Sequence, residues 1–181
     1  MFNGSALVSM NGKIVYKSAF GFANIEYEIL NKPDTKFEIG SCTKQFTAIL
    51  IMMLKEKKQI NLDDKITDYL PEYPSDQGGK ITIHNLLSHT SSIPEYAELP
   101  KMECLLFREN KSSEFMKVFW DLDLNFEPGS ELRYSNSNYF ILGAIIERIT
   151  GKPYAQVLQE NIFNPLGMTN SGVIQITTFS G

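Results

Sequence analysis

Residues 37–47 read FEIGSCTKQFT, and residues 48–56 continue as AILIMMLKE. From Thr43 onward, apolar residues recur at the three- and four-residue spacing of an amphipathic helix, and several intervening positions are apolar as well. This pattern predicts a central, buried helix that begins near Cys42. Ser41 and Lys44 are one helical turn apart, so we expect their side chains to touch at the N-terminal end of that helix.

The Ser41–Lys44 pair suits nucleophilic catalysis. Serine alone is a weak nucleophile and needs a neighbouring base, and a lysine that loses solvation beside apolar packing can take that part. The positive end of the helix dipole also favours negative charge near Ser41. A simpler interpretation stays open, because Ser41 could be an N-cap and Lys44 a solvated lysine, and a Ser-x-x-Lys match arises easily by chance.

A second motif, Tyr134-Ser135-Asn136, follows the turn signal Glu127-Pro128-Gly129 and precedes a helical pattern that starts near Asn138. We therefore expect the triplet on a loop that presents its side chains to a cleft. A tyrosine beside an ammonium group can exchange protons with a serine, and an asparagine amide can orient a substrate carbonyl. Taken alone, Tyr134 is simply one of 8 tyrosines, but the two motifs together favour a shared site.

The remaining pattern predicts a small amount of sheet followed by many helices. Ser5–Met10 and Lys13–Ser18 alternate apolar residues around Asn11-Gly12, which favours a β-hairpin. Further expected elements are short helical turns at Leu62-Asp63-Asp64 and Thr82–Leu87, a helix from about Asn138 closed by Gly151, a helix after Pro153, and a long loop from Glu95 to Ser113.

Composition argues against several classes of function. The formal net charge is -4 and no run of basic residues is present, so nucleic acid is an improbable partner. The longest apolar run, Ala48–Leu54, is too short to span a bilayer, and the first residues do not resemble a signal peptide. As written, the chain is expected to be cytoplasmic, with no transmembrane segment.

Metal and redox chemistry are not expected either. Cys42 and Cys104 are too few for a disulfide framework and are interpreted as free thiols. His84 and His89 would point to different faces of a helix, and no ligand pattern completes a metal site, so we expect no metal and no cofactor. We interpret His89 as a hydrogen-bonded structural histidine and not as a base.

The chain resembles the serine β-lactamase and penicillin-binding protein superfamily, most closely its class C β-lactamase and D-alanyl-D-alanine carboxypeptidase branch, which also contains esterases. The segments that carry the resemblance are residues 37–47, Leu62-Asp63-Asp64, residues 81–91, Pro128-Gly129, Tyr134-Ser135-Asn136, Thr150-Gly151 and Pro165-Leu166-Gly167-Met168. The resemblance implies an α+β fold, with a helical region packed on an antiparallel sheet, here limited to the N-terminal hairpin and the helical region.

The same resemblance assigns roles to individual residues. It implies Ser41 as the acylated nucleophile, Lys44 as its proton-handling partner, Tyr134 as the general base or its relay, and Asn136 as a substrate contact. The implied substrate is a β-lactam, a D-alanyl peptide or a small ester. His89-Thr90-Ser91 is then a structural turn beneath the site.

Two departures from the family pattern qualify these expectations. Ser92 stands where the family usually has glycine, which adopts some backbone conformations more freely. Residues 1–181 are also expected to be a partial domain, without the later strands and the Lys-Thr-Gly or His-x-Gly motif. An inactive fragment or a penicillin-binding remnant is therefore the alternative to an active hydrolase. The orphaned edge of the hairpin predicts self-association. Members of the family are often exported, which leaves the native compartment open.

Overall fold

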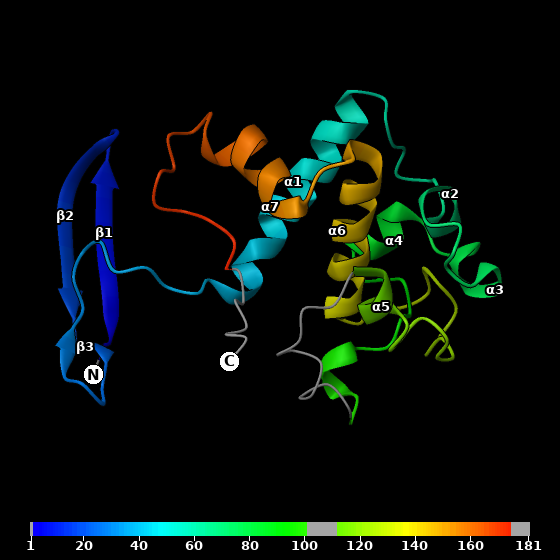
Figure 1. Cartoon of the computed structure of the whole chain (residues 1–181), viewed down its shortest axis with the longest axis horizontal. Helices are drawn as coiled ribbons and strands as arrows, with labels where there is room; N and C mark the ends of the chain where they lie inside the picture. The colour runs from blue at the N-terminus through cyan, green and yellow to red at the C-terminus, as the bar shows by residue number, and fades with distance from the viewer. Residues whose placement is uncertain (1, 101–111, 175–181) are drawn as a thin grey trace, which may run out of the picture. The chain divides into compact units, whose positions relative to one another are not determined.

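The computed structural model describes residues 2–100 and 112–174, and it divides into two compact units, residues 1–40 and 41–181 (Figure 1). Small antiparallel sheets occupy the first unit and helices the second. The predicted α+β class is therefore confirmed. The prediction that residues 1–181 form one partial domain stays a prediction.

The first unit is built on the predicted hairpin. Strands β1 (Gly4–Met10) and β2 (Lys13–Phe20) pair antiparallel, with Val8 opposite Tyr16. Both residues of the turn have positive φ, 51° at Asn11 and 75° at Gly12, as a two-residue hairpin turn of this type requires. A second, smaller pair follows, formed by β3 (Phe22–Asn24) and β4 (Ile29–Leu30). The Asn-Gly signal thus located the hairpin correctly.

The second unit is organised around one helix, α6 (Asn136–Thr150). It packs against α1 (Thr43–Glu56), α2 (Ile66–Tyr69), α4 (Ile83–Leu87), α5 (Ser112–Met116) and α7 (Tyr154–Leu158), and Figure 1 shows it between α1 and α4. The unit also contains α3 (Ser75–Gly78), a short 3₁₀ turn at Tyr96–Glu98 and a π-helix at Gln159–Phe163, and a further 3₁₀ turn at Gly40–Cys42 leads into the unit. The central position of α6 fixes where its first residue lies, and that residue is Asn136.

The ends of the helices follow the predicted chemistry. Thr82 Oγ1 accepts a hydrogen bond from the Asn85 backbone N–H at 3.0 Å, and Asn85 Oδ1 accepts one from the Thr82 N–H at 3.0 Å. This reciprocal pair caps α4. At the C-terminal end of α6, Gly151 closes the helix with φ of 66°, a left-handed conformation that glycine adopts without strain.

Three predictions about local structure were wrong in part. Helix α1 was expected to be buried, and it does bury Leu50 and Ile51. Ile49 is 48% exposed and Met52 is 46% exposed, because only one face of α1 packs against α6 within the unit. Leu62-Asp63-Asp64 forms a turn and the helix begins only at Ile66. The stretch expected to be a long loop contains the 3₁₀ turn at Tyr96–Glu98 and the start of α5, while residues 101–111 lie outside the described part.

The buried face of α6 should dominate the stability of the second unit. Leu142 has no exposed surface and lies in the core with Ile141, Ile145 and Ile146. Leu142→Ala is expected to lower the free energy of unfolding by about 2–5 kcal/mol, because the cavity adds to the lost burial. The matched control is Leu166→Ala, whose side chain is 69% exposed and whose loss should cost far less. Chemical denaturation of both variants provides the measurement, and equal effects would contradict this account.

Candidate active site

Ser41 lies in the 3₁₀ turn at Gly40–Cys42, which leads directly into α1. Gly40 has φ of 52°, a left-handed conformation that glycine permits, and the chain turns there into the helix. Lys44 follows one turn later, and its Nζ donates a hydrogen bond to Ser41 Oγ at 3.1 Å. The predicted contact between the two side chains is therefore present, at the N-terminal end of the helix.

Tyr134 and Asn136 complete a hydrogen-bonded cluster with these two residues. Ser41 Oγ lies 2.7 Å from the Tyr134 hydroxyl, which donates to Asn136 Oδ1 at 3.1 Å. Since the tyrosine proton is engaged with Asn136, the serine hydroxyl is left to donate to Tyr134. Lys44 Nζ also donates to Asn136 Oδ1, at 2.6 Å. The structure thus brings together all four predicted site residues, while their catalytic roles stay predictions.

The charge of Lys44 acts directly on Tyr134. Its Nζ lies 4.9 Å from the centre of the Tyr134 ring and 5.6 Å from that of Tyr139. The hydrogen-bonding Lys44 ammonium lowers the pKa of Tyr134, and the hydrogen bond with Ser41 adds to that effect. Both Tyr134 and Ser41 are exposed.

Backbone contacts with a neighbouring turn hold the loop before Tyr134. The N–H of Gly129 donates to the Thr90 carbonyl at 2.8 Å, and that of Arg133 donates to the His89 carbonyl at 2.8 Å. Tyr134 therefore lies on a loop, as predicted. Asn136, which was also placed on the loop, is instead the first residue of α6, so a helix end fixes its position.

A reciprocal set of hydrogen bonds ties the start of α6 to residues 94–97, and sequence reasoning missed it. The Glu95 carboxylate accepts the backbone N–H groups of Asn136 and Ala97, the latter at 2.8 Å. Ser137 Oγ donates to the Pro94 carbonyl at 2.6 Å and accepts the Tyr96 N–H at 3.0 Å. Partners about 40 residues apart leave no local signal, because each residue looks ordinary in its own segment.

Ser92, at the position where the family usually has glycine, adopts a left-handed backbone conformation. Its φ is 73°, which costs a residue with a side chain about 1–2 kcal/mol. Its Oγ accepts the N–H of Phe126 and its carbonyl accepts the N–H of Asn125 at 3.0 Å, contacts that offset this strain. Ser92 therefore adopts a left-handed conformation at this position, with hydrogen bonds to its side chain and its carbonyl.

Neither a metal site nor a membrane span appears within the described ranges. These residues contain no group of three or more His, Cys, Asp or Glu side chains placed to hold a metal ion. Cys42 is a free, exposed thiol, and Cys104 lies outside the described residues. Among the same residues, every helix is too short or too polar to cross a bilayer.

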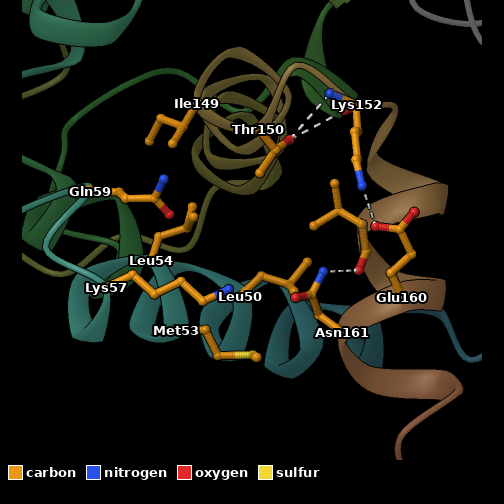
Figure 2. A pocket seen from close by; sticks show the side chains of 11 residues that line it. Leu50, Met53, Leu54, Lys57, Gln59, Ile149, Thr150, Lys152, Glu160 and Asn161 are labelled. Carbon is orange, nitrogen blue, oxygen red and sulfur yellow. Dashed lines mark hydrogen bonds and ion pairs between the residues drawn. The ribbon is translucent and has the colours of Figure 1, made fainter.

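A separate cavity of about 270 Å³ lies at the opposite end of α1 (Figure 2). Leu50, Leu54 and Val157 supply apolar walls, and a hydrogen-bonded Lys152–Glu160 ion pair of 2.6 Å lies at its side. None of the four residues of the Ser41 cluster lines it. The cavity therefore does not belong to the candidate site.

Comparison with known proteins identifies the family. The family model described as Beta-lactamase matches residues 2–175, which is nearly the whole chain. The chain belongs to the beta-lactamase family. It is 34% identical over 175 residues to the putative penicillin-binding protein PbpX of Bacillus subtilis, covering 94% of this chain and 41% of PbpX.

Solved structures agree with this assignment. A penicillin-binding protein from Bacillus halodurans superposes with a TM-score of 0.83 at 30% identity, over 97% of this chain and 55% of that one. The octameric penicillin-binding protein homologue from Pyrococcus abyssi gives a TM-score of 0.77 at 32% identity, over 91% and 39% of the two chains. The chain thus has a β-lactamase-like fold and spans about half or less of the length of these relatives.

Proposed function

We propose that this member of the beta-lactamase family is a serine hydrolase that acts through an acyl-enzyme on Ser41. The supporting observation is the placement of Ser41 Oγ 2.7 Å from the Tyr134 hydroxyl and 3.1 Å from Lys44 Nζ. Ser41 is then a nucleophile in contact with a proton acceptor, Tyr134, and with a cation, Lys44, that stabilises the deprotonated form of that acceptor.

The proposed reaction has two stages. Ser41 Oγ attacks a carbonyl carbon while its proton moves to the oxygen of deprotonated Tyr134, and Lys44 stabilises the charge that this oxygen carries beforehand. When the tetrahedral intermediate collapses, the C–N or C–O bond breaks and Tyr134 returns the proton to the leaving group. Water then hydrolyses the ester on Ser41. The N-terminal end of α1 favours the negative charge that develops beside Ser41.

We further propose that the substrate is a β-lactam, a D-alanyl peptide or a small ester. Asn136 supports such a carbonyl substrate, because its Oδ1 accepts from Lys44 and Tyr134 and its Nδ2 remains the group able to donate. The names of PbpX and of the B. halodurans and P. abyssi structures favour the first class, because each refers to penicillin binding.

A penicillin-binding remnant with little turnover, or an inactive fragment, is the alternative. Loss of a single oxyanion donor typically slows an acyl-transfer enzyme about a hundred- to a thousand-fold. A chain that keeps the Ser41 cluster without such a donor would still be acylated slowly, but it would turn over few substrate molecules.

One labelling experiment separates these possibilities. The purified chain is incubated with a fluorescent penicillin and, in parallel, with a fluorophosphonate, the adduct is located by peptide mapping, and hydrolysis of a chromogenic β-lactam is followed. Adduct on Ser41 with turnover supports the hydrolase, and adduct on Ser41 without turnover supports the remnant. Adduct on a different serine contradicts the assignment of the nucleophile, and absence of any adduct supports the inactive fragment.

We also propose that a second copy of this chain pairs with the β1–β2 hairpin. Each strand of the hairpin has one partner among the described residues, so two edges are open for pairing. Apolar side chains on it are exposed, including Val8 at 51% and Met10 at 63%. A two-stranded sheet is only marginally stable in water, and an apolar, unpaired edge favours association. The octameric homologue from P. abyssi supports assembly of a related chain with copies of itself.

Light scattering at micromolar concentration is expected to give a dimer or a larger assembly. Val8→Lys places a charge on the exposed hairpin face and should shift the chain toward monomer, because a buried unpaired charge opposes association. Ile174→Lys changes another exposed apolar residue outside the hairpin and serves as the matched control. A wild-type chain that stays monomeric at every concentration would contradict the proposal.

A further inference from the structure

His89 contacts the candidate site through its backbone and its ring. Its carbonyl accepts the Arg133 N–H at 2.8 Å, and its ring Nδ1 accepts the Ser135 N–H at 3.2 Å. These two partners are the residues on either side of Tyr134. The ring itself stacks on the Tyr134 ring at a centroid distance of 4.6 Å. His89 therefore contacts the backbone on both sides of Tyr134 and one face of the Tyr134 ring.

The hydrogen bonds around His89 require a neutral ring with its proton on Nε2. The Ser135 backbone N–H can only donate, so Nδ1 has to be an acceptor. Asn138 Nδ2 lies 3.4 Å from the same nitrogen, and Asn138 Oδ1 accepts the Ser91 hydroxyl at 2.5 Å, which turns the amide NH₂ toward His89. A proton on Nδ1 would face two donor groups.

We propose that neutral His89 is a positioning residue for Tyr134, and that protonation of its ring releases Tyr134 from Ser41 and switches the site off at acid pH. This inference rests on the proposed function of the Ser41 cluster. Protonation would exchange an acceptor for a donor at Nδ1, break the contact with Ser135, and thereby loosen the backbone next to Tyr134. The φ of 58° at His89, strained for a non-glycine residue, is then held by fewer contacts.

The charges near His89 oppose its protonation on balance. Its ring faces Lys44 from α1, Tyr134 from the preceding loop, Tyr139 from α6 at a centroid distance of 5.2 Å, and Glu95 from the segment before Tyr96–Glu98. Burial and the Lys44 ammonium lower the pKa of His89, and the Ser135 backbone and the Glu95 carboxylate act in the opposite direction. The ordinary pKa of histidine is about 6.5, so we expect His89 to be protonated, and Tyr134 to be released, only as the pH falls below that value.

The test combines NMR with labelling. The chain has 2 histidines, so ¹⁵N-histidine spectra of the wild type and of His84→Gln assign the His89 signals directly. We expect the Nε2–H tautomer at neutral pH, and we expect the Tyr134 ring signals, assigned with Tyr134→Phe, to shift as His89 titrates. An Nδ1–H tautomer at neutral pH, or Tyr134 signals that do not respond to this titration, would overturn the inference.

Two variants separate positioning from a purely structural role. His89→Asn tolerates positive φ and keeps an acceptor but has no titratable ring, whereas His89→Phe keeps the ring face but has no acceptor. Wild-type labelling of Ser41 should fall about tenfold or more as His89 protonates, because small displacements of a proton acceptor are costly. In His89→Asn labelling should fall at acid pH only as far as protonation of Tyr134 itself requires, without the further loss that follows the His89 titration, and in His89→Phe labelling should be slow at every pH.

The outcomes for the two proposals are distinguishable. An acid loss that is identical in wild type and His89→Asn overturns the inference and leaves the proposed function intact. If neither probe labels the chain at any pH, the proposed hydrolase function fails, while a Tyr134 signal that follows the His89 titration still supports the positioning contact.

Discussion

Ser41→Ala is expected to abolish covalent labelling by a fluorescent penicillin and by a fluorophosphonate. The reason is chemical, because the acyl or phosphonyl bond forms to Ser41 Oγ and alanine has no atom to take its place. The side chain is exposed at the start of α1, so its loss should change the stability of the fold little. In-gel fluorescence and intact mass of variant and wild type provide the measurement.

The matched control for this loss is Ser9→Ala. Ser9 is also exposed, and its Oγ only donates to the Lys13 carbonyl within the hairpin, at 3.3 Å. Labelling of Ser9→Ala should equal that of the wild type. Adduct that persists in Ser41→Ala would show that another nucleophile reacts, and the assignment of the site to Ser41 would be wrong.

The parts of this site that the sequence predicted are those set by short-range spacing. Ser41 and Lys44 meet because three residues make one helical turn, and Asn11-Gly12 makes a hairpin because both residues tolerate positive φ. Tyr134 has no such local relation to Ser41, and the two were linked by the complementary chemistry of their motifs and by the family resemblance. Its place 2.7 Å from Ser41 Oγ depends on a loop fixed by contacts with the turn at residues 89–90.

The contacts that sequence reasoning missed connect segments far apart in the chain. Glu95 lies in a stretch expected to be a loop, and nothing in its neighbourhood indicates that its carboxylate caps α6. His89 was expected to be structural, and its hydrogen bond with Ser135 agrees, but its stacking on Tyr134 joins two distant segments and has no local signal in the sequence. Burial is similarly non-local, since periodicity identified the apolar face of α1 but could not tell that Ile49 and Met52 would stay exposed.

Lys44→Ala is expected to slow labelling of Ser41 at neutral pH by at least about a hundred-fold, the usual range for loss of an acid–base partner. In the proposed reaction Lys44 acts mainly through Tyr134, since its ammonium lowers the pKa of the tyrosine and so increases the phenolate present at neutral pH. Labelling should therefore rise with pH until Tyr134 is deprotonated, and that rise should move to higher pH in Lys44→Ala.

The pH profile decides which part Lys44 plays. If Lys44 only stabilises the Tyr134 phenolate, alkaline pH should restore much of the labelling rate of Lys44→Ala, because hydroxide then deprotonates the tyrosine without help. If Lys44 itself removes the serine proton, the deficit should persist at every pH, since no other group replaces its nitrogen 3.1 Å from Ser41 Oγ. Lys55→Ala, an exposed lysine in the last turn of α1, controls for the loss of a charge on the same helix. A Lys44→Ala chain labelled as fast as Lys55→Ala would exclude both roles.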